Sequence, residues 1–381
     1  MQTSVNEIIE ITEGTTKILV PSNSISDKVP PRDPAFFNPR ARLNRDFSII
    51  VYSTFWKNFE GPKIFLDGMS GLGARTLRVA NEILNVEKVF FNDVNSKALE
   101  LASKSTFLNN LQNYEISVNE VCRFFSLHSK KNQRGSIVDI DPFGSPTKYI
   151  DCGIRATMHG GILSSTATDL QVLHGLFVNA CKRKYYGTPV KTEYSNEIAI
   201  RLILGCISIV AARLDIQIEP VFVDNKMHYY RTYVKILNKP DTADKIGYIL
   251  HCKKCGHRSL SKIQNENCDV CNSKLEIAGP LWLGKLFDKK FVESMLEESK
   301  NHSVDKKCES ILEKCILESE MPGTYFTLDE IASKMKVAPL GLKEALNKLH
   351  QEGFLSSPTS LSTTGFRTNC KINKIIEIFS N

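Results

Sequence analysis

The pattern of apolar and polar positions separates short strands from amphipathic helices in the first half of the chain. The predicted strands lie at 64–66, 89–91, 137–140 and 161–164, and the predicted helices at 47–59, 76–84 and 97–108. A strand or hairpin over 14–21 and a proline-rich connector precede them. Strands that alternate with helices predict an α/β fold with a parallel, Rossmann-like sheet that has helices on both faces.

A second region begins near Thr188 and has a different pattern. It contains an apolar helix over 197–214 and two strands over 216–223 and 229–237. Because arginines at positions 201 and 213 interrupt the helix, we interpret it as a buried helix and not as a membrane span. After about residue 309 the chain is mostly helical and charged.

The end of the chain resembles a winged helix. Thr327 to Glu330 forms a capping box that opens one helix. A turn at 337–339 leads to a second helix that ends near Gly353, and Phe354-Leu355 is predicted as a strand. Such modules often bind nucleic acid, and packing support for the first domain is an equal alternative. Arg367 and Lys371 are basic residues that could contact phosphate here.

We therefore predict two domains. Residues 1–187 form an N-terminal extension with the Rossmann-like domain, and residues 188–381 form a C-terminal α+β domain that binds RNA. The second domain includes a zinc ribbon over 248–277 and the winged-helix-like segment over 309–381.

The segment from Asp67 to Arg75 joins the first strand of the sheet to its helix. Gly71 and Gly73 permit a sharp turn and a close approach of the backbone to a ligand, and the helix that follows has free N–H groups at its start. Asp93 ends the next strand, where a carboxylate can accept both hydroxyl hydrogens of a ribose. The glycine spacing departs from G-x-G-x-x-G, which disfavours a nicotinamide dinucleotide.

Asp141, Pro142, Phe143 and Gly144 follow the apolar run at 137–140. A carboxylate and an aromatic ring at the carboxyl end of a strand can hold a planar amine, since the carboxylate accepts the hydrogens and the ring stacks on the base. An ordinary polar turn with a proline can have the same residues, so this motif alone does not indicate a binding site. Its position relative to the other motifs along the chain supports the functional interpretation. It comes third after the glycine loop and Asp93, as expected for successive strands of one nucleotide-binding sheet.

Four of the eleven cysteines are spaced as two metal knuckles, Cys252-x-x-Cys255 and Cys268-x-x-Cys271. Four thiolates at this spacing suit tetrahedral zinc without an open position, so we predict a structural Zn²⁺. The region is basic and is either a phosphate contact or a solvated surface; its basic residues are Lys253, Lys254, Arg258, Lys262 and Lys274.

Charge and cysteine usage add little to this assignment. The formal net charge of +7 permits a polyanionic partner without requiring one. Residues 1–10 include acids and no apolar core, so we expect no secretory signal. The seven cysteines outside the knuckles are scattered, which we interpret as thiols of a protein in the reducing cytoplasm.

Several strings resemble one family, the archaeal and eukaryotic tRNA (guanine-N2) dimethyltransferases that modify guanine 26. The strings are Asn38 to Arg40, Asn44 to Asp46, Asp67 to Arg75, Asn92-Asp93, Asp139 to Pro146, Thr166 to Asp169, Gly279 to Gly284 and Thr364 to Thr368. The resemblance implies a class I methyltransferase domain that uses S-adenosyl-L-methionine and adds one or two methyl groups to the N2 amine of a tRNA guanine. It implies tRNA as the partner and no membrane, and it points to no particular protein partner.

The resemblance also implies roles for individual residues. Asp141 is the expected catalytic carboxylate, and Phe36 and Phe143 are expected to hold the guanine. The expected cofactor-binding residues are Arg45, Asp67, Gly71, Gly73, Arg75, Asp93, Glu120 and Val121. Glu120 stands where the family often has aspartate, and Leu72 where it often has threonine.

Two alternatives stay open at this point. One is a methyltransferase that acts on another exocyclic base amine, such as an rRNA guanine or an adenine. Asp-Pro-Phe-Gly in place of Asn/Asp-Pro-Pro-Tyr/Phe favours the tRNA guanine. The other is a non-catalytic zinc-ribbon and winged-helix protein that binds nucleic acid, which the intact glycine loop, Asp93 and Asp141 disfavour.

Overall fold

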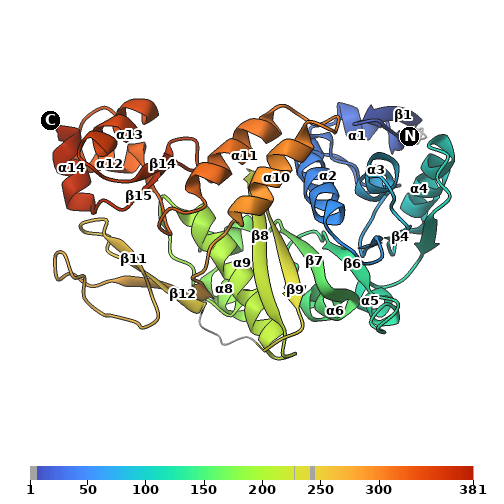
Figure 1. Cartoon of the computed structure of the whole chain (residues 1–381), viewed down its shortest axis with the longest axis horizontal. Helices are drawn as coiled ribbons and strands as arrows, with labels where there is room; N and C mark the ends of the chain where they lie inside the picture. The colour runs from blue at the N-terminus through green and yellow to red at the C-terminus, as the bar shows by residue number, and fades with distance from the viewer. Residues whose placement is uncertain (1–6, 227, 241–244, 381) are drawn as a thin grey trace, which may run out of the picture.

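The computed structural model describes residues 7–226, 228–240 and 245–380. A sheet with the strand order β5-β4-β3-β6-β7-β9-β8 forms its centre (Figure 1). Strands β3 to β7 pair in parallel, and β9 runs antiparallel to both β7 and β8. The strands are β3 (Ile64–Asp67), β4 (Lys88–Asn92), β5 (Tyr114–Ser117), β6 (Gly135–Ile140), β7 (Thr157–Ala167), β8 (Gln217–Lys226) and β9 (Tyr229–Leu237). The predicted α/β fold is confirmed.

Two groups of helices cover the two faces of this sheet (Figure 1). In the first group α2 contacts α3 and α3 contacts α4; in the second, α6 contacts both α5 and α9. Their bounds are α2 (Arg42–Lys57), α3 (Ala74–Glu82), α4 (Ser96–Leu108), α5 (Val121–Leu127), α6 (Ile150–Ala156) and α9 (Ser195–Ala212). A short 3-10 helix, η2 (Thr147–Tyr149), precedes α6. α9 is apolar and long enough to cross a membrane, but 78% of it is buried inside the protein, as predicted.

The expected division of the chain at residues 187 and 188 does not match an edge of the sheet. The strands predicted at 216–223 and 229–237 are β8 and β9, and they complete the sheet of the first domain. One continuous core of buried residues extends from Ile18 to Leu361. Placing these strands in the second domain was wrong, because the pairing of β9 with β7 joins residues that are far apart in the sequence.

The N-terminal hairpin lies on the first group of helices. β1 (Ile8–Glu13) pairs with β2 (Thr16–Pro21), and β2 contacts α3 and α4. The chain then passes through α1 (Asn23–Ser26) and η1 (Pro39–Ala41). Between them, the Pro34 carbonyl accepts a hydrogen bond of 3.0 Å from the Asn95 side chain, which ties the connector to the segment that follows β4.

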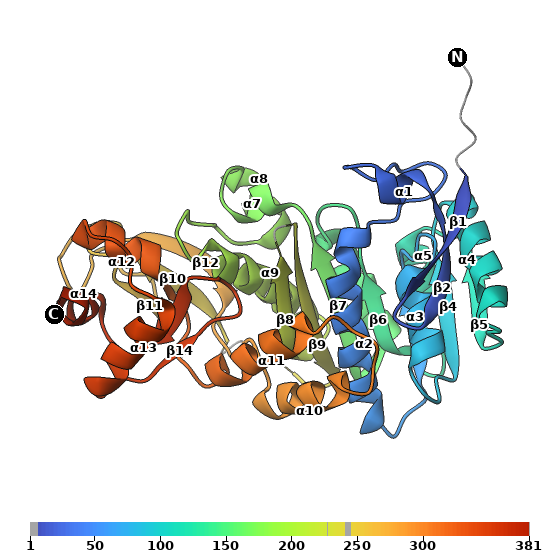
Figure 2. The same cartoon turned by 90° about the horizontal axis from the view of Figure 1, so that it is seen from above.

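Two further helices, α7 (Leu170–Leu173) and α8 (Val178–Tyr185), connect β7 to α9. They lie on the same side of the sheet as α1 (Figure 2). Since β7 leads directly into them, this is the side where the parallel strands end.

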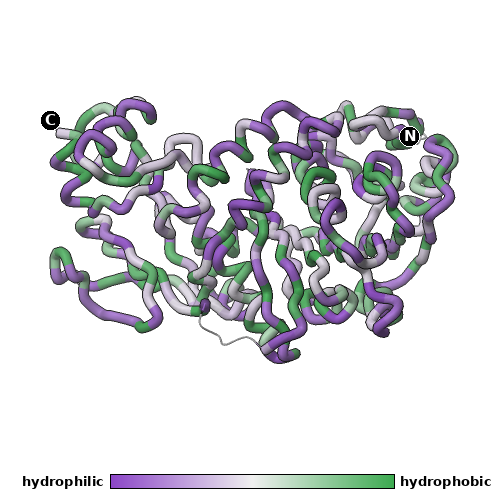
Figure 3. The backbone as a smooth tube through the Cα atoms, in the orientation of Figure 1, coloured by the Kyte–Doolittle hydropathy of each residue, from purple (hydrophilic) through white to green (hydrophobic). Residues whose placement is uncertain are grey.

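The cysteine-containing segment forms a sheet of its own, with the order β11-β10-β12. Its strands are β10 (Ile246–His251), β11 (Arg258–Ser261) and β12 (Glu276–Trp282). α10 (Lys289–Ser299) and α11 (Lys307–Glu318) follow and both pack on α2. Hydrophilic and hydrophobic residues alternate along these two helices, as expected where one helix face is buried (Figure 3).

The last segment has the order of a winged helix and a small core of its own. Its three-stranded antiparallel sheet has the order β13-β15-β14. The elements are β13 (Phe326–Thr327), α12 (Leu328–Met335), α13 (Leu342–Gln351), β14 (Ser356–Pro358), β15 (Gly365–Thr368) and α14 (Ile372–Ser380). The strand expected at Phe354-Leu355 begins slightly later, at Ser356.

Two arginines from the basic segments of the second domain are buried and do not face a phosphate. The Arg258 side chain pairs with Glu330 of α12 and lies between the rings of Tyr194 and Phe326. Arg367 is only 3% exposed and pairs with Glu318 of α11 at 2.6 Å and with Glu197 of α9 at 3.0 Å. The expectation that these two arginines are surface residues was wrong, since acids from distant segments surround them.

We expect Arg367→Ala to lower the free energy of unfolding by about 3–5 kcal/mol, because it leaves buried carboxylates without their cation. Urea denaturation measures this change. Lys371→Ala is the control, because Lys371 is exposed in the same segment and a surface substitution should cost less than about 0.5 kcal/mol. Equal stability of the two variants would contradict the role of Arg367.

Candidate active site

The loop between β3 and α3 has the backbone conformation that its glycines predicted. Gly71 has φ of 54° and Gly73 has φ of 82°, both in the left-handed region. A Cβ atom at Gly73 would also lie 2.6 Å from the Phe91 ring. Asp67 holds the loop, since its carboxylate accepts hydrogen bonds from the Met69 N–H at 3.1 Å and the Thr76 hydroxyl at 2.6 Å. The loop therefore cannot take larger residues at Gly73 without rearrangement.

Asp93 lies beside this loop at the end of β4. One carboxylate oxygen accepts a hydrogen bond of 2.8 Å from the Gly71 N–H and the other accepts one of 2.9 Å from the Asn95 N–H. An ionised carboxylate can accept about four hydrogen bonds, so acceptor capacity remains for a diol. The sequence prediction that Gly71 and Asp93 come together is thus matched by the geometry.

Glu120 and Val121 lie at the start of α5, after β5. The Glu120 carboxylate caps the helix by accepting a hydrogen bond of 3.1 Å from the Arg123 N–H, and the Val121 side chain is buried. Nearby, Cys122 of α5 and Cys152 of α6 form a disulfide. We expected all seven cysteines outside the metal knuckles to be free thiols. This was wrong for Cys122 and Cys152, because folding brings together two cysteines that are 30 residues apart.

A buried cluster of charges lies beneath the carboxyl ends of β3 and β6. Asp139 of β6 is fully buried and pairs with Arg231 of β9 at 2.5 Å and with Arg75 of α3 at 3.3 Å. The Tyr52 hydroxyl of α2 donates to the same carboxylate at 2.7 Å. Arg231 also donates to Thr166 of β7 at 2.6 Å. The cluster therefore links five elements of the domain.

Arg75 extends from this cluster to the candidate catalytic residue Asp141. Its Nη2 lies 2.7 Å from the Asp141 carboxylate and donates at 2.6 Å to the Asn44 side chain. Burial acts to raise the pKa of Asp141, but the positive charges of Arg75 and Arg231 outweigh it and lower the pKa below its ordinary value. The Asp141 side chain is 29% exposed, so an ionised carboxylate faces the surface at the end of β6.

Asp67 has the opposite shift. Burial, with a further contribution from the negative charge of Asp139, raises the pKa of Asp67 to about 7. The guanidinium of Arg75 acts in the opposite direction but does not offset burial and the charge of Asp139. The carboxyl edge of the sheet therefore has an affinity for positive charge.

Phe143 and Phe36 form an aromatic corner beside Asp141. The Phe143 side chain is 61% exposed, and its ring meets the edge of the Phe36 ring at a centroid distance of 4.9 Å. The Arg32 guanidinium lies 4.7 Å from the Phe143 centroid. Gly144 follows with φ of 88° and open space around its Cα. An exposed ring with a free approach is suited to stacking on a planar group.

Arg45 lies away from these groups. Its guanidinium is buried and makes two hydrogen bonds of 2.6 Å with the Glu13 carboxylate from the N-terminal hairpin. It also donates to the Asn38 carbonyl at 3.2 Å and lies over the Phe37 ring. In this structure Arg45 thus supports the segment that carries Phe36, and its direct contact with a cofactor stays a prediction.

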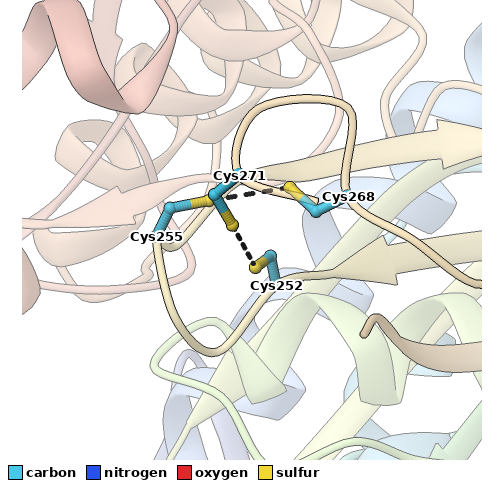
Figure 4. Close-up of side chains that lie close together, drawn as sticks. All are labelled: Cys252, Cys255, Cys268 and Cys271. Atoms are coloured by element: carbon cyan, nitrogen blue, oxygen red, sulfur yellow. Dashed lines mark hydrogen bonds between the residues drawn. The ribbon is translucent and has the colours of Figure 1, made fainter. Parts of the chain in front are cut away.

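The four knuckle cysteines come together at one point (Figure 4). All four sulfur atoms lie within 4.8 Å of one another, with Cys252 to Cys271 at 3.4 Å and Cys255 to Cys268 at 3.7 Å. Tetrahedral zinc with Zn–S bonds of about 2.3 Å places its sulfurs about 3.8 Å apart. The donor set therefore fits a closed, four-thiolate zinc site, as the spacing predicted.

Three residues around the site were not among those singled out from the sequence. Arg231, Tyr52 and Asn44 reach the cluster from β9 and α2. Asn44 belongs to one of the strings that resemble the family, and this resemblance could have identified it as a site residue. No local pattern marks Arg231 or Tyr52, since each contacts residues more than 80 positions away.

Together, these elements define a class of protein. A parallel sheet with a glycine-rich loop after β3, an acid after β4 and an Asp-Pro-Phe turn after β6 is the fold of class I S-adenosylmethionine-dependent methyltransferases. The particular family follows from comparison with known proteins. The model of the N2,N2-dimethylguanosine tRNA methyltransferase family matches residues 14–380, and the chain belongs to this family.

Individual relatives agree with this assignment. A tRNA (guanine(26)-N(2))-dimethyltransferase of Methanobrevibacter smithii is 34% identical over 98% of this chain and 97% of its own. A tRNA (guanine(26)-N(2)/guanine(27)-N(2))-dimethyltransferase of Aquifex aeolicus is 32% identical over 97% of this chain and 95% of its own. The solved structure of Trm1 from Pyrococcus horikoshii with S-adenosyl-L-methionine has a TM-score of 0.83 and 30% identity over 97% of this chain and 99% of its own. The family resemblance of the sequence strings is confirmed.

We expect the stability difference between the wild type and Asp67→Asn to depend on pH. Between about pH 4 and pH 7 the folded chain keeps the Asp67 proton and the unfolded chain releases it. The wild type therefore loses free energy of unfolding relative to the variant as the pH rises through this window. Urea denaturation of both proteins at several pH values measures the difference, and a pH-independent difference would contradict the raised pKa.

We expect the double variant Cys255→Ser/Cys271→Ser to lose bound zinc and to melt at a lower temperature, because metal binding to a closed site contributes to folding. Elemental analysis and thermal melting measure the two effects. Cys122→Ser/Cys152→Ser is the matched control, since these cysteines lie outside the cluster. Zinc content that is the same in both double variants would show that the cluster is not the metal site.

Proposed function

We propose that this chain transfers one or two methyl groups from S-adenosyl-L-methionine to the N2 amine of guanine 26 in tRNA. Membership in the N2,N2-dimethylguanosine tRNA methyltransferase family supports the reaction. The observation that carries the site is the ionised Asp141 beside an exposed Phe143, at the carboxyl end of the strand next to the glycine loop. These groups can hold a planar amine where a cofactor of this fold binds.

The residues around the loop fit the proposed cofactor. S-adenosyl-L-methionine supplies an electrophilic methyl group on a cationic sulfur, and the surplus of carboxylates near Asp67 and Asp141 suits a cation. The Arg75 Nε is buried and has no hydrogen-bond partner within the described residues, so it can donate to a ligand carboxylate. We expect Asp93, which retains acceptor capacity, to bind the ribose, and Glu120 and Val121 at the start of α5 to contact the adenine.

Asp141 serves as an acceptor for the hydrogens of the guanine amine. The N2 lone pair is delocalised into the purine ring, and hydrogen bonds from N2–H to a carboxylate localise it. Because Arg75 lowers the pKa of Asp141, this carboxylate is a weak base and mainly orients the amine. A weak base is sufficient to take the proton after transfer, since a methylated ammonium of guanine is a strong acid. Fixed orientation of the reactants supplies much of the rate.

Phe143 and Phe36 hold the base once it has left its stack. Extrusion of a paired base costs a few kcal/mol, and stacking on an aromatic ring returns about 1–3 kcal/mol. Arg32 lies over Phe143 in the free protein and would have to give way or remain as a second layer. The buried Arg45–Glu13 ion pair stabilises the segment that carries Phe36.

We also propose that the four-cysteine cluster holds one structural Zn²⁺ and that the protein acts on tRNA in the cytoplasm. Two basic residues of the ribbon and winged helix, the exposed Lys254 and the half-buried Lys334, line a cavity of about 430 Å³ between the two modules. They are the residues of the second domain that we expect to meet phosphate, in place of the buried Arg258 and Arg367.

Nucleoside mass spectrometry of an unmodified tRNA transcript after incubation with the protein and cofactor tests this function. We expect N2-methylguanosine and N2,N2-dimethylguanosine at position 26. A transcript with inosine at position 26 is the matched control, because inosine lacks only the N2 amine. The same experiment shows whether guanine 27 is also methylated, as the name of the Aquifex relative states for that protein. Unmodified guanosine at position 26 would disprove the proposal.

We expect Asp141→Asn to lower the rate of methyl transfer by at least about 10²-fold, because the amide loses the carboxylate charge that orients the amine and accepts its proton. Cofactor affinity should change little, since the expected cofactor residues remain. Initial rates with labelled cofactor and calorimetry measure the two effects. Asp151→Asn is the control, since Asp151 is exposed on α6. A variant Asp141→Asn with wild-type rates would remove Asp141 from the reaction.

A further inference from the structure

The α7–α8 surface consists of exposed side chains on α8 and on the residues that directly precede and follow it, between β7 and α9. Three of them are large and apolar, with exposed fractions of 59% for Leu176, 53% for Phe177 and 50% for Tyr186. Lys182 and Arg183 are exposed on the same short helix. Isolated apolar residues on a surface are ordinary, but here three large apolar side chains and two cations are exposed within eleven positions of the chain.

The charge of this surface has one sign. Residues 170–187 include no aspartate or glutamate, and the last turn of α8 contains Lys182, Arg183 and Lys184. Lys184 pairs with Asp169 at 3.1 Å. Lys182 and Arg183 have no ion pair within the described part of the chain, so their charges are available to an anionic partner.

Tyr186 has an unusual backbone conformation for an aromatic residue. Its φ is 59°, in the left-handed region where a bulky side chain is disfavoured. It ends α8, a position that glycine commonly takes at no steric cost. An exposed aromatic ring kept at such a position indicates that the ring has a use.

The α7–α8 surface is attached directly to the turn that carries Phe143. The Gly144 N–H donates to the Thr168 hydroxyl at 2.7 Å, and the Thr168 N–H donates to the Gly144 carbonyl at 2.8 Å. The Ser145 hydroxyl donates to Tyr185 of α8 at 3.0 Å, and Tyr185 donates to Asp169 at 2.6 Å. These hydrogen bonds fix the position of α8 relative to the turn that carries Phe143.

We propose that the α7–α8 surface binds unpaired or extruded nucleotides of the RNA next to the target guanine, an inference that rests on the proposed function. Phe177 and Tyr186 stack on nucleobases, and Lys182 and Arg183 contact the phosphates that join them. Aromatic rings interleaved with cations are typical of surfaces that bind single-stranded nucleic acid. A second copy of this chain fits less well, since the net charge of the chain is +7 and the surface is itself basic.

Binding of tRNA and methyl transfer together test this surface. We expect Phe177→Ala to weaken tRNA binding about tenfold, the loss of one base stack, with a matching rise in the KM for tRNA. Phe177→Tyr should restore both because it keeps a ring. Lys182→Ala/Arg183→Ala should make the dependence of log K on log salt shallower by about 1.4, for two lost phosphate contacts to a single strand.

The matched controls are Phe107→Ala and Lys104→Ala on α4, an exposed ring and an exposed cation on another part of the surface. They should bind tRNA as the wild type does. Cofactor affinity and melting temperature verify that every variant is folded.

The outcomes separate this inference from the function on which it rests. A wild type that does not methylate the transcript disproves the proposed function. A wild type that methylates, with Phe177→Ala and Lys182→Ala/Arg183→Ala equal to the α4 controls in tRNA binding, overturns the inference alone. The inference is also overturned if the variants change the oligomeric state measured by light scattering but bind tRNA as the wild type does. In that case the α7–α8 surface binds a second copy of the chain.

Discussion

The buried ion cluster around Asp139 is the constraint on which the rest of the catalytic domain depends. Asp139 has no exposure and is paired with Arg231 and Arg75, while Tyr52 donates to the same carboxylate. A buried charge without its partner lowers the free energy of unfolding by several kcal/mol, so removing any one of these side chains destabilises the fold. Because the partners come from β6, β9, α3 and α2, the cluster determines how these elements meet. It also determines where Arg75 points, and thereby the position and charge of Asp141.

The same cluster prepares the carboxyl edge of the sheet for its chemistry. Burial, with a further contribution from the negative charge of Asp139, raises the pKa of Asp67 to about 7. The charges of Arg75 and Arg231 outweigh burial at Asp141 and lower its pKa, whereas Asp67 holds its proton more tightly than an ordinary aspartate. Two aspartates at the ends of adjacent strands thus acquire different properties, one suited to hold an amine and the other to stabilise a loop.

The modules of the C-terminal part are joined to one another and to α9 by a related device. Arg367 ties the winged helix to α9 and α11 through Glu197 and Glu318, and Arg258 ties the zinc ribbon to α12 through Glu330. These pairs are buried, so they orient the modules more than they stabilise them. A rigid connection matters for an enzyme that acts on a large RNA, because contacts made far from the site then help to place the target base. The α7–α8 surface would serve the same purpose next to the site.

The sequence by itself determined the features that depend on a few neighbouring residues. The glycine loop, the acids that end β4 and β6, the Cys-x-x-Cys pairs and the order of the winged helix were all predictable, since their geometry is set by short segments. Only the tertiary structure determined which charged residues are buried and which partners they have. Arg231 and Tyr52 belong to the cluster although no sequence pattern predicted it, and Arg258 and Arg367 are buried. β8 and β9 belong to the sheet of the first domain. A side chain's partner across 80 or more positions depends on how the whole chain packs, and no local pattern records it.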